Sequence, residues 1–362
     1  MSFHSLKISK IVSETSEAKT IYFDVPTQWK NIFQHKAGQY LTIKTEINGK
    51  EIRRPYSLCT SPDQSPGVTV KKVAKGAMST FLNEKVSVGD YLDVMAPQGH
   101  FTIIPDHLKS QDHYFIAAGS GITPVMSMIR TILEHEPKST CYLLYGNRNE
   151  ESIIFKEELD QISGKYADQL FVEHILSQPN AKKAGGISGI FGKKTSDWKG
   201  LKGRIKADGL KDFFRDNPSK KDIRQYYLCG PGDFIEKIEA VLLAMNIDKK
   251  TIHKEYFTPA KENVSHEGGT DGAVATVTLK GATFDMVIPA GKTILDVLVD
   301  NKKDPPYSCT SGACSTCMAK VTEGEVSMDS CYALDEDEIA AGYILTCQSH
   351  PTTNKVVLTY DV

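Results

Sequence analysis

Short runs of alternating apolar and polar residues fill the first part of the chain. They cover residues 5–12, 20–25, 40–47 and 91–96 and are separated by Gly and Pro. Alternation with a period of two is typical of strands that bury one face, and Gly and Pro mark the turns between them. The pattern predicts a small antiparallel β-barrel, which we place at residues 1–105.

Apolar strands then alternate with segments of helical period. Strands are expected from His113 and at 141–145, 170–175, 226–229 and 251–257, with helices after Pro124 and at 155–162 and 233–245. Strands that alternate with helices are typical of a parallel sheet covered on both faces. We therefore predict an α/β doubly wound domain at residues 106–257.

The polar, Gly-rich stretch 258–272 has neither hydrophobic period and predicts a flexible linker. Beyond it, 274–280 and 283–289 alternate as a hairpin that turns at Gly281, Thr293 is expected to cap a helix over 294–299, and 355–360 reads as a final strand. These elements predict a third, α+β domain at residues 273–362. Three domains suit a chain of 362 residues.

The small net charge hides an asymmetry. Residues 273–362 contain 6 Lys, no Arg and 12 acidic residues, a net charge of −6, which leaves +4 for residues 1–272. The acidic module is either a solvated surface, as 335–338 would be in the first turn of a helix, or a docking surface for partner proteins. No apolar stretch approaches the roughly 18 residues of a membrane span, and neither a membrane nor a nucleic-acid partner is expected.

The most specific chemical signal is a group of cysteines near the C-terminus. They have the spacing C-x4-C-x2-C with a fourth cysteine later in the chain: Cys309, Cys314, Cys317 and Cys347. This is the plant-type ligand pattern of a [2Fe-2S] cluster. A structural zinc site, the alternative, usually has two short Cys/His pairs, and only Cys314 and Cys317 form one here. The spacing therefore predicts a one-electron carrier.

The other cysteines, Cys59, Cys141, Cys229 and Cys331, show no paired framework. The chain also opens without a charged segment followed by an apolar run. Both features favour a reducing, cytoplasmic location.

Two segments of the barrel carry the chemistry of a flavin site. A flavin is expected because it accepts the two electrons of a hydride and releases them singly to a cluster. Arg54 offers a guanidinium for a phosphate, Tyr56 a ring for the isoalloxazine and Ser57 a hydroxyl for its N5 edge. An ordinary strand with an exposed arginine is the alternative. Residues 70–82 add a strand, a turn at Gly76 and a helix start, which together form an anion site.

The α/β domain carries a second anion site. Gly119, Ser120 and Gly121 follow a buried strand and precede a helix that begins near Pro124, so backbone N–H groups there can receive a pyrophosphate. The G-x-G-x-x-G fingerprint is absent. Cys229 and Gly230 end a strand at the edge where such sheets hold ligands.

In this order the motifs resemble the ferredoxin-NADP reductase superfamily fused to a C-terminal plant-type ferredoxin, over nearly the whole chain. The resemblance implies a β-grasp fold for the ferredoxin domain. It implies FAD binding by Arg54, Tyr56, Ser57, Gly76, Met78 and Ser79, with Lys72 a weaker candidate, and NADPH binding by Gly119, Gly121, Thr123, Pro124, Cys229 and Gly230. Glu255, Tyr256 and Phe257 fall where the family brings an acidic or aromatic group near the flavin. Arg148 stands where an arginine would favour NADPH over NADH.

The resemblance implies hydride transfer from NADPH to the flavin beside Ser57, Cys229 and Glu255, with Ser57 and Cys229 as positioning groups and not as covalent nucleophiles. Single electrons would then pass through the cluster to a protein acceptor. Residues 144–148 and 152–156 are most similar to reductase subunits of phenylacetyl-CoA epoxidases, and related proteins serve steroid and aromatic-ring hydroxylases. A stand-alone flavin or quinone reductase, a redox sensor and a zinc-stapled interaction protein remain alternatives. The Lys-rich stretch 181–203 is either a solvated loop or a contact for an acidic partner.

Overall fold

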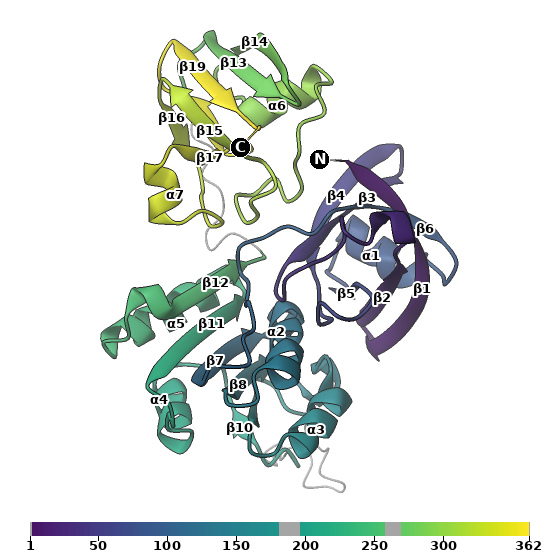
Figure 1. The fold of residues 1–362 in the computed structure, drawn as a ribbon, viewed down its shortest axis with the longest axis vertical. Helices are drawn as coiled ribbons and strands as arrows, with labels where there is room; N and C mark the ends of the chain where they lie inside the picture. Colours follow the sequence, from purple (N-terminus) through teal and green to yellow (C-terminus); the bar gives the residue numbers. More distant parts are fainter. Residues whose placement is uncertain (1, 181–195, 258–268, 362) are drawn as a thin grey trace, which may run out of the picture.

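The computed structural model describes residues 2–180, 196–257 and 269–361. They form three domains, with the barrel, the α/β domain and the C-terminal domain meeting near the centre of the molecule (Figure 1). The expected linker 258–272 and the Lys-rich stretch 181–203 lie mostly outside the described residues. Among the described helices, none is long and apolar enough to cross a membrane.

The N-terminal domain is an antiparallel barrel. Its strands are β1 (Phe3–Thr15), β2 (Ala18–Asp24), β3 (Tyr40–Ile47), β4 (Lys50–Ser57), β5 (Gly67–Lys71) and β6 (Tyr91–Met95), in the order β4-β3-β6-β1-β2-β5. A bridge between Leu58 and Val68 joins the two edges of this sheet. Alternate residues such as Leu41 and Ile43 fill the interior, and helix α1 (Ala77–Glu84) packs Met78 into the same core.

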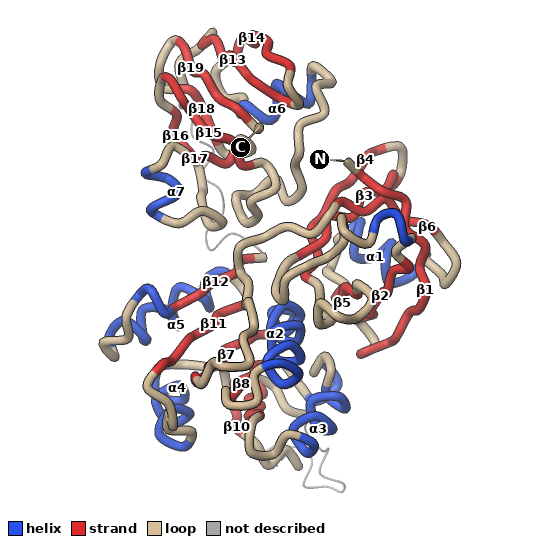
Figure 2. Tube along the Cα trace, in the orientation of Figure 1, coloured by secondary structure: helices blue, strands red, loops and turns tan. Residues whose placement is uncertain are grey.

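The second domain is a parallel sheet with helices on both faces (Figure 2). Its strands run in the order β10 (Leu201–Lys202), β9 (Leu170–Leu176), β8 (Thr140–Asn147), β7 (Gln111–Ala118), β11 (Ile223–Gly230) and β12 (Ile252–Tyr256). Helices α2 (Ile122–His135) and α3 (Lys156–Lys165) pack into one core. Helices α4 (Ala207–Asp216) and α5 (Gly232–Ala244) pack into the other.

The C-terminal domain has a five-stranded mixed sheet. Its strands are β14 (Ala282–Ile288), β13 (Ala273–Leu279), β19 (Lys355–Thr359), β15 (Met318–Glu323) and β17 (Tyr343–Leu345), in that order. Helix α6 (Ile294–Asp300) buries Ile294 and Leu298 against it and begins with a capping box between Thr293 and Asp296. Strands β16 (Val326–Met328) and β18 (Ser349–Pro351) pair separately, and α7 (Glu336–Ala340) follows the N-cap Asp335. The predicted fold class is therefore confirmed in all three domains.

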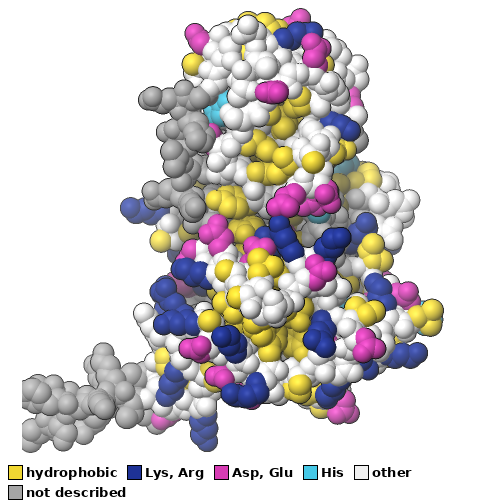
Figure 3. All heavy atoms as spheres, turned by 90° about the vertical axis from the view of Figure 1, so that its left-hand side faces the viewer, with side chains coloured by type: hydrophobic (Ala, Val, Ile, Leu, Met, Phe, Trp, Pro, Cys, Tyr) yellow, Lys and Arg dark blue, Asp and Glu magenta, His cyan; other side chains and the backbone are white. Residues whose placement is uncertain are grey.

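The domains share apolar contacts, such as that of Phe101 with the core of the α/β domain, and are also joined by polar side chains. Ser127 on α2 donates a hydrogen bond of 2.6 Å to the Thr60 carbonyl of the barrel, and Arg130 donates to the Cys59 carbonyl. On the other side, Glu336 of the C-terminal domain pairs with Lys249 at 2.7 Å. Figure 3 shows acidic side chains meeting Lys and Arg side chains where these domains face each other. Part of the negative charge predicted for the C-terminal module is thus paired within the molecule.

Candidate functional site

The three residues predicted to act in hydride transfer lie together. The Ser57 hydroxyl, at the end of β4, donates a 3.1 Å hydrogen bond to Oε2 of Glu255 on β12. Cys229 on β11 is the parallel-sheet partner of Glu255. A barrel strand and two strands of the parallel sheet therefore place a hydroxyl, a thiol and a carboxyl at one junction.

Burial controls the charge of this group. Removal from water raises the pKa of Glu255 to about 8, and the Ser57 hydrogen bond offsets only part of this rise. Burial also raises the pKa of the Cys229 thiol, and the neighbouring Glu255 carboxyl raises it further. Glu255 is therefore mainly a neutral acid near pH 7, able to hold or release a proton, and Cys229 is a neutral thiol.

The predicted nucleotide turn lies against the same junction. Gly121 sits so close to β11 that a Cβ added there would lie 2.1 Å from the Cys229 carbonyl oxygen. Gly119 has φ of +57°, which favours glycine, and its carbonyl accepts a 2.9 Å hydrogen bond from the Tyr145 hydroxyl. Thr123 donates to the Ser120 carbonyl at 3.0 Å and so fixes the first turn before Pro124. The backbone of this turn therefore forms a site that can receive an anionic ligand.

The turn and helix start of the second predicted anion site lie at the beginning of α1. Gly76 is its N-cap, and the Ser79 hydroxyl accepts the Val73 N–H at 3.1 Å and donates to the Gly76 carbonyl. Lys72 pairs instead with Glu84 on the barrel surface. Lys71 lies nearer the other turn, since its Nζ would be 4.0 Å from a Cβ on Gly119. Sequence reasoning missed Lys71.

Other predicted ligands come from both domains that form the junction. Arg54 is exposed and donates to its neighbour's carbonyl at 2.7 Å, so its remaining N–H groups are available for a phosphate. Tyr56 packs against the barrel core and Phe257 against the core of the α/β domain. Arg148 is exposed just past the carboxyl end of β8, next to the strand that leads into Gly119. The donors and open turns fit a flavin and a nicotinamide nucleotide.

The four predicted cluster ligands converge in the C-terminal domain. The Cys309 thiol contacts those of Cys314 and Cys347, and Cys347 also contacts Cys317. The Ser311 N–H points at Cys309 Sγ at 3.4 Å, and the Gln348 amide points at Cys347 Sγ at 3.7 Å. Hydrogen bonds of this kind stabilise reduced cluster sulfurs.

The spacing of these thiols fits a two-iron cluster. Thiolates around one tetrahedral zinc lie about 3.8 Å apart, as Zn–S bonds near 2.3 Å require. Among the described residues, however, no three of these thiols lie within 4.8 Å of one another. The thiols instead follow one another in the order Cys314, Cys309, Cys347 and Cys317, which suits two metal ions better than a single ion.

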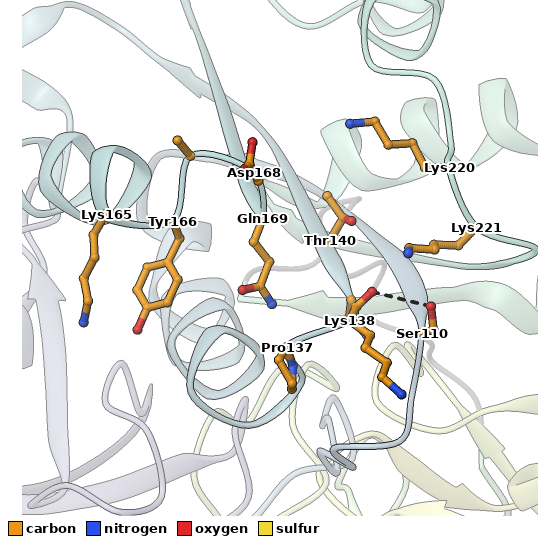
Figure 4. Close-up of a pocket in the computed structure, with 12 residues that line it drawn as sticks. Ser110, Pro137, Lys138, Thr140, Lys165, Tyr166, Asp168, Gln169, Lys220 and Lys221 are labelled. Carbon is orange, nitrogen blue, oxygen red and sulfur yellow. Dashed lines mark hydrogen bonds between the residues drawn. The ribbon is translucent and has the colours of Figure 1, made fainter.

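A separate cavity of about 530 Å³ lies at the amino edge of the parallel sheet. Figure 4 shows its lining, which includes Lys138, Thr140, Lys165, Lys220 and Lys221, with the Ser110 hydroxyl donating to the Lys138 carbonyl. Doubly wound sheets bind nucleotides at the carboxyl edge. This cavity is therefore not the nucleotide site, and none of the predicted site residues lines it.

Sequence reasoning also missed the side chains that join the barrel to the cluster segment. Tyr40, Thr42 and Arg53 contact Thr316, Ser308 and Asp304, respectively. The only sequence signal was the presence of polar residues at alternate positions of β3 and β4.

Comparisons with known proteins agree with these three parts. An oxidoreductase FAD-binding domain model matches residues 5–103, an oxidoreductase NAD-binding domain model matches residues 115–240, and a 2Fe-2S iron-sulfur cluster binding domain model matches residues 277–352. The chain is 37% identical to one of the subunits of the 1,2-phenylacetyl-CoA epoxidase of Escherichia coli K12, over 99% of this chain and 98% of that protein. It is 32% identical to the ferredoxin reductase component of the 3-ketosteroid-9-alpha-monooxygenase of Rhodococcus rhodochrous, over 98% of this chain and 96% of that protein.

Among solved structures, phthalate dioxygenase reductase superposes with a TM-score of 0.59 at 24% identity, covering 99% of this chain and 98% of that one. This likeness shows that the two proteins share a fold. The relatives and the three domain matches show that the chain belongs to the family of oxygenase reductase components that combine FAD-binding, NAD-binding and [2Fe-2S] domains.

Proposed function

We propose that the protein takes a hydride from NADPH and delivers single electrons to a phenylacetyl-CoA epoxidase-type oxygenase. The observation that carries the proposal is the meeting of Ser57, Cys229 and Glu255 where the barrel contacts the parallel sheet. Similarity to the Escherichia coli epoxidase protein supports the choice of acceptor.

The chain's residues hold and orient the reacting groups. Bound FAD would supply the change from a two-electron donor to one-electron acceptors. Arg54 and the turn at Gly76 would hold its phosphates, and the Ser57 hydroxyl would turn its one hydrogen from Glu255 to the ring. Glu255 would keep a proton available at the same place, because its pKa is raised to about 8. Cys229 would pack beside the nicotinamide.

The preference for NADPH over NADH rests on Arg148. Its exposed guanidinium lies at the carboxyl edge of the sheet, where a 2′-phosphate would add two negative charges to the nucleotide. A cytoplasmic location stays a prediction, favoured by the unpaired cysteines.

The visible spectrum of the purified protein tests the electron path. Under anaerobic conditions, stoichiometric NADPH should bleach flavin bands first and the broad cluster absorbance second, and NADH should act more slowly. Replacement of Arg148 by Ala should remove most of the difference between the two nucleotides. A colourless protein that contains zinc would refute the proposal.

The acceptor is tested by turnover. Addition of the oxygenase components of a phenylacetyl-CoA epoxidase should couple NADPH oxidation to epoxide formation. If quinones or free flavins are reduced faster than the oxygenase, the stand-alone reductase is correct. If cluster reduction changes binding to a partner without turnover, the redox-sensor alternative is correct.

A further inference from the structure

One face of strands β3 and β4 contacts the segment that carries the first cluster ligands. Cross-strand pairing sets Tyr40 opposite Ser57 and Lys44 opposite Arg53. Residues two apart on a strand share a face, so Tyr40, Thr42 and Arg53 point one way while Leu41 and Ile43 fill the barrel core. We call Tyr40, Thr42 and Arg53 the docking face.

Arg53 is the charged centre of this face. Its side chain is only 7% exposed, and its guanidinium donates to the Asp304 carboxylate at 3.1 Å, to the Pro305 carbonyl at 3.4 Å and to Glu51 at 2.8 Å. It also lies 4.2 Å from the centre of the Tyr307 ring. A buried arginine is stable only when its N–H groups have hydrogen-bond acceptors. Two of these acceptors, Asp304 and Pro305, belong to the C-terminal domain.

Asp304 is matched to this arginine. Burial alone would raise the pKa of its carboxyl, but hydrogen bonds from Lys280 and Arg53 hold the pKa below its ordinary value. Asp304 therefore stays charged at neutral pH, and the ion pair spans the two domains.

Tyr40 connects strand β3 to the cluster loop. Strand β3 pairs with β4, which ends at Ser57. The Tyr40 hydroxyl lies 3.0 Å from Oγ1 of Thr316, which in turn lies 3.5 Å from Cys314 Sγ. The ring has little freedom, because the backbone of Tyr40 bonds twice to Gln98 and a Cβ on Gly99 would lie 3.0 Å from the ring. Burial keeps the Tyr40 hydroxyl protonated by raising its pKa.

We propose that the docking face positions the cluster for electron transfer from the flavin, with Arg53 as the anchor and Tyr40 as the link to the ligand loop. The inference rests on the proposed function. One electron would pass from bound FAD to a bound cluster, and no bond would form or break. Arg53 and Tyr40 are positioning residues, because Arg53 touches the segment before Cys309 and Tyr40 touches Thr316, and neither touches the reacting atoms.

Tyr40, unlike Arg53, should also affect the reduction potential of the cluster. With Cys314 bound to iron as a thiolate, the Thr316 hydroxyl donates to the sulfur, and a hydrogen bond from Tyr40 to Thr316 orients and strengthens this bond. Hydrogen bonds to cluster sulfurs raise the reduction potential. Loss of the Tyr40 hydroxyl should therefore lower the potential, whereas loss of Arg53 should leave it unchanged.

The test compares Arg53→Gln with Arg215→Gln in the full-length, cofactor-loaded protein. Arg215 is 68% exposed and, among the residues that the structure describes, pairs with Asp212 and Asp216 on its own helix, so the control has the same change of charge. After mixing with NADPH, Arg53→Gln should slow the cluster phase about tenfold or more relative to the flavin phase, because small misplacements cost large factors in rate. Small-angle scattering should show a larger radius of gyration. Arg215→Gln should match the wild type in both.

Tyr40→Phe provides the second arm, with Tyr91→Phe as its control, since Tyr91 is 64% exposed. Tyr40→Phe should lower the cluster potential and slow the cluster phase while the radius of gyration stays unchanged. If Arg53→Gln does not fold, this arm decides alone. A cluster phase in Arg53→Gln and Tyr40→Phe equal to that of their controls overturns the proposal. If NADPH does not bleach the flavin of the wild-type protein, the proposed function is refuted instead. Scattering would still test whether Arg53 holds the C-terminal domain against the barrel.

Discussion

At the residue scale, Glu255 gives the molecule a defined dependence on pH. Its pKa is about 8 in the folded protein, above the value of an unfolded chain. Between about pH 5 and 8 the folded state holds the extra proton, so this group's contribution to stability falls by about 1.4 kcal/mol per pH unit as pH rises and levels off above 8. Glu255→Gln should remove that slope. Thermal unfolding of the cofactor-free protein across this range measures it, and parallel curves for both proteins would contradict the pKa assignment.

The Ser57 hydroxyl is expected to act on hydride transfer and not on folding. Ser57→Ala should slow the flavin phase after mixing with NADPH about five- to tenfold, the cost of one hydrogen bond made at the reacting ring. Its thermal unfolding should stay close to that of the wild type. Ser163→Ala on α3 is the control, because the Ser163 hydroxyl donates an exposed hydrogen bond to the Asp160 carbonyl. A flavin phase equal in the two variants would exclude the predicted role.

The cysteines differ in role although they share a domain. Cys317→Ser should abolish the electron paramagnetic resonance signal of the reduced [2Fe-2S] cluster, because it removes one of four ligands. Cys331→Ser should keep the signal, since Cys331 packs beside the core that contains Cys317 and Cys347 and lies outside the ligand spacing. Loss of the signal in both variants would mean that Cys331 takes part in ligation.

At the element scale, the turn after β7 can lie against the end of β11 only because Gly121 has no side chain. Gly121 has no strained dihedral, but its Cβ would lie 2.1 Å from the Cys229 carbonyl oxygen. Gly121→Ala should therefore destabilise the domain by about 1 to 3 kcal/mol and weaken NADPH binding. Gly164→Ala on α3 meets nothing within 4 Å and should stabilise by about 0.5 to 1 kcal/mol. Unfolding midpoints and nucleotide titrations compare them, and equal stabilities would contradict the packing argument.

Elements with a strong local period could be predicted from the sequence. The hairpin that turns at Gly281 and the helix capped by Thr293 appear as β13, β14 and α6. Helix α4 was not predicted, because the polar segments around it hide its few buried positions, Leu210 and Phe213. The meeting of Ser57 with Glu255 was expected only through family resemblance, since no local pattern encodes a contact across 198 residues. The site residues themselves stay predictions.

At the scale of the whole molecule, charge is divided between the domains so that the acidic module faces a mildly basic body. The sequence showed this asymmetry but could not show which charges pair. The Arg53 contact to Asp304 spans 251 residues, and its arginine lies inside the strand that leads into the flavin motif. Because Arg53 is buried, its ion pair with Asp304 can fix the position of the C-terminal domain. The net charge of each domain does not reveal this role.

A second ion pair between domains should contribute far less. Lys249 and Glu336 are 58% and 86% exposed, so water and salt screen their attraction. Lys249→Ala should therefore change the cluster phase by less than about twofold and leave the radius of gyration unchanged, since exposed ion pairs contribute little. Raising the ionic strength should reproduce this small effect in the wild type. If Lys249→Ala instead slows cluster reduction as strongly as Arg53→Gln, the C-terminal domain is held by its contact with the α/β domain, and the barrel face does not determine where the cluster sits.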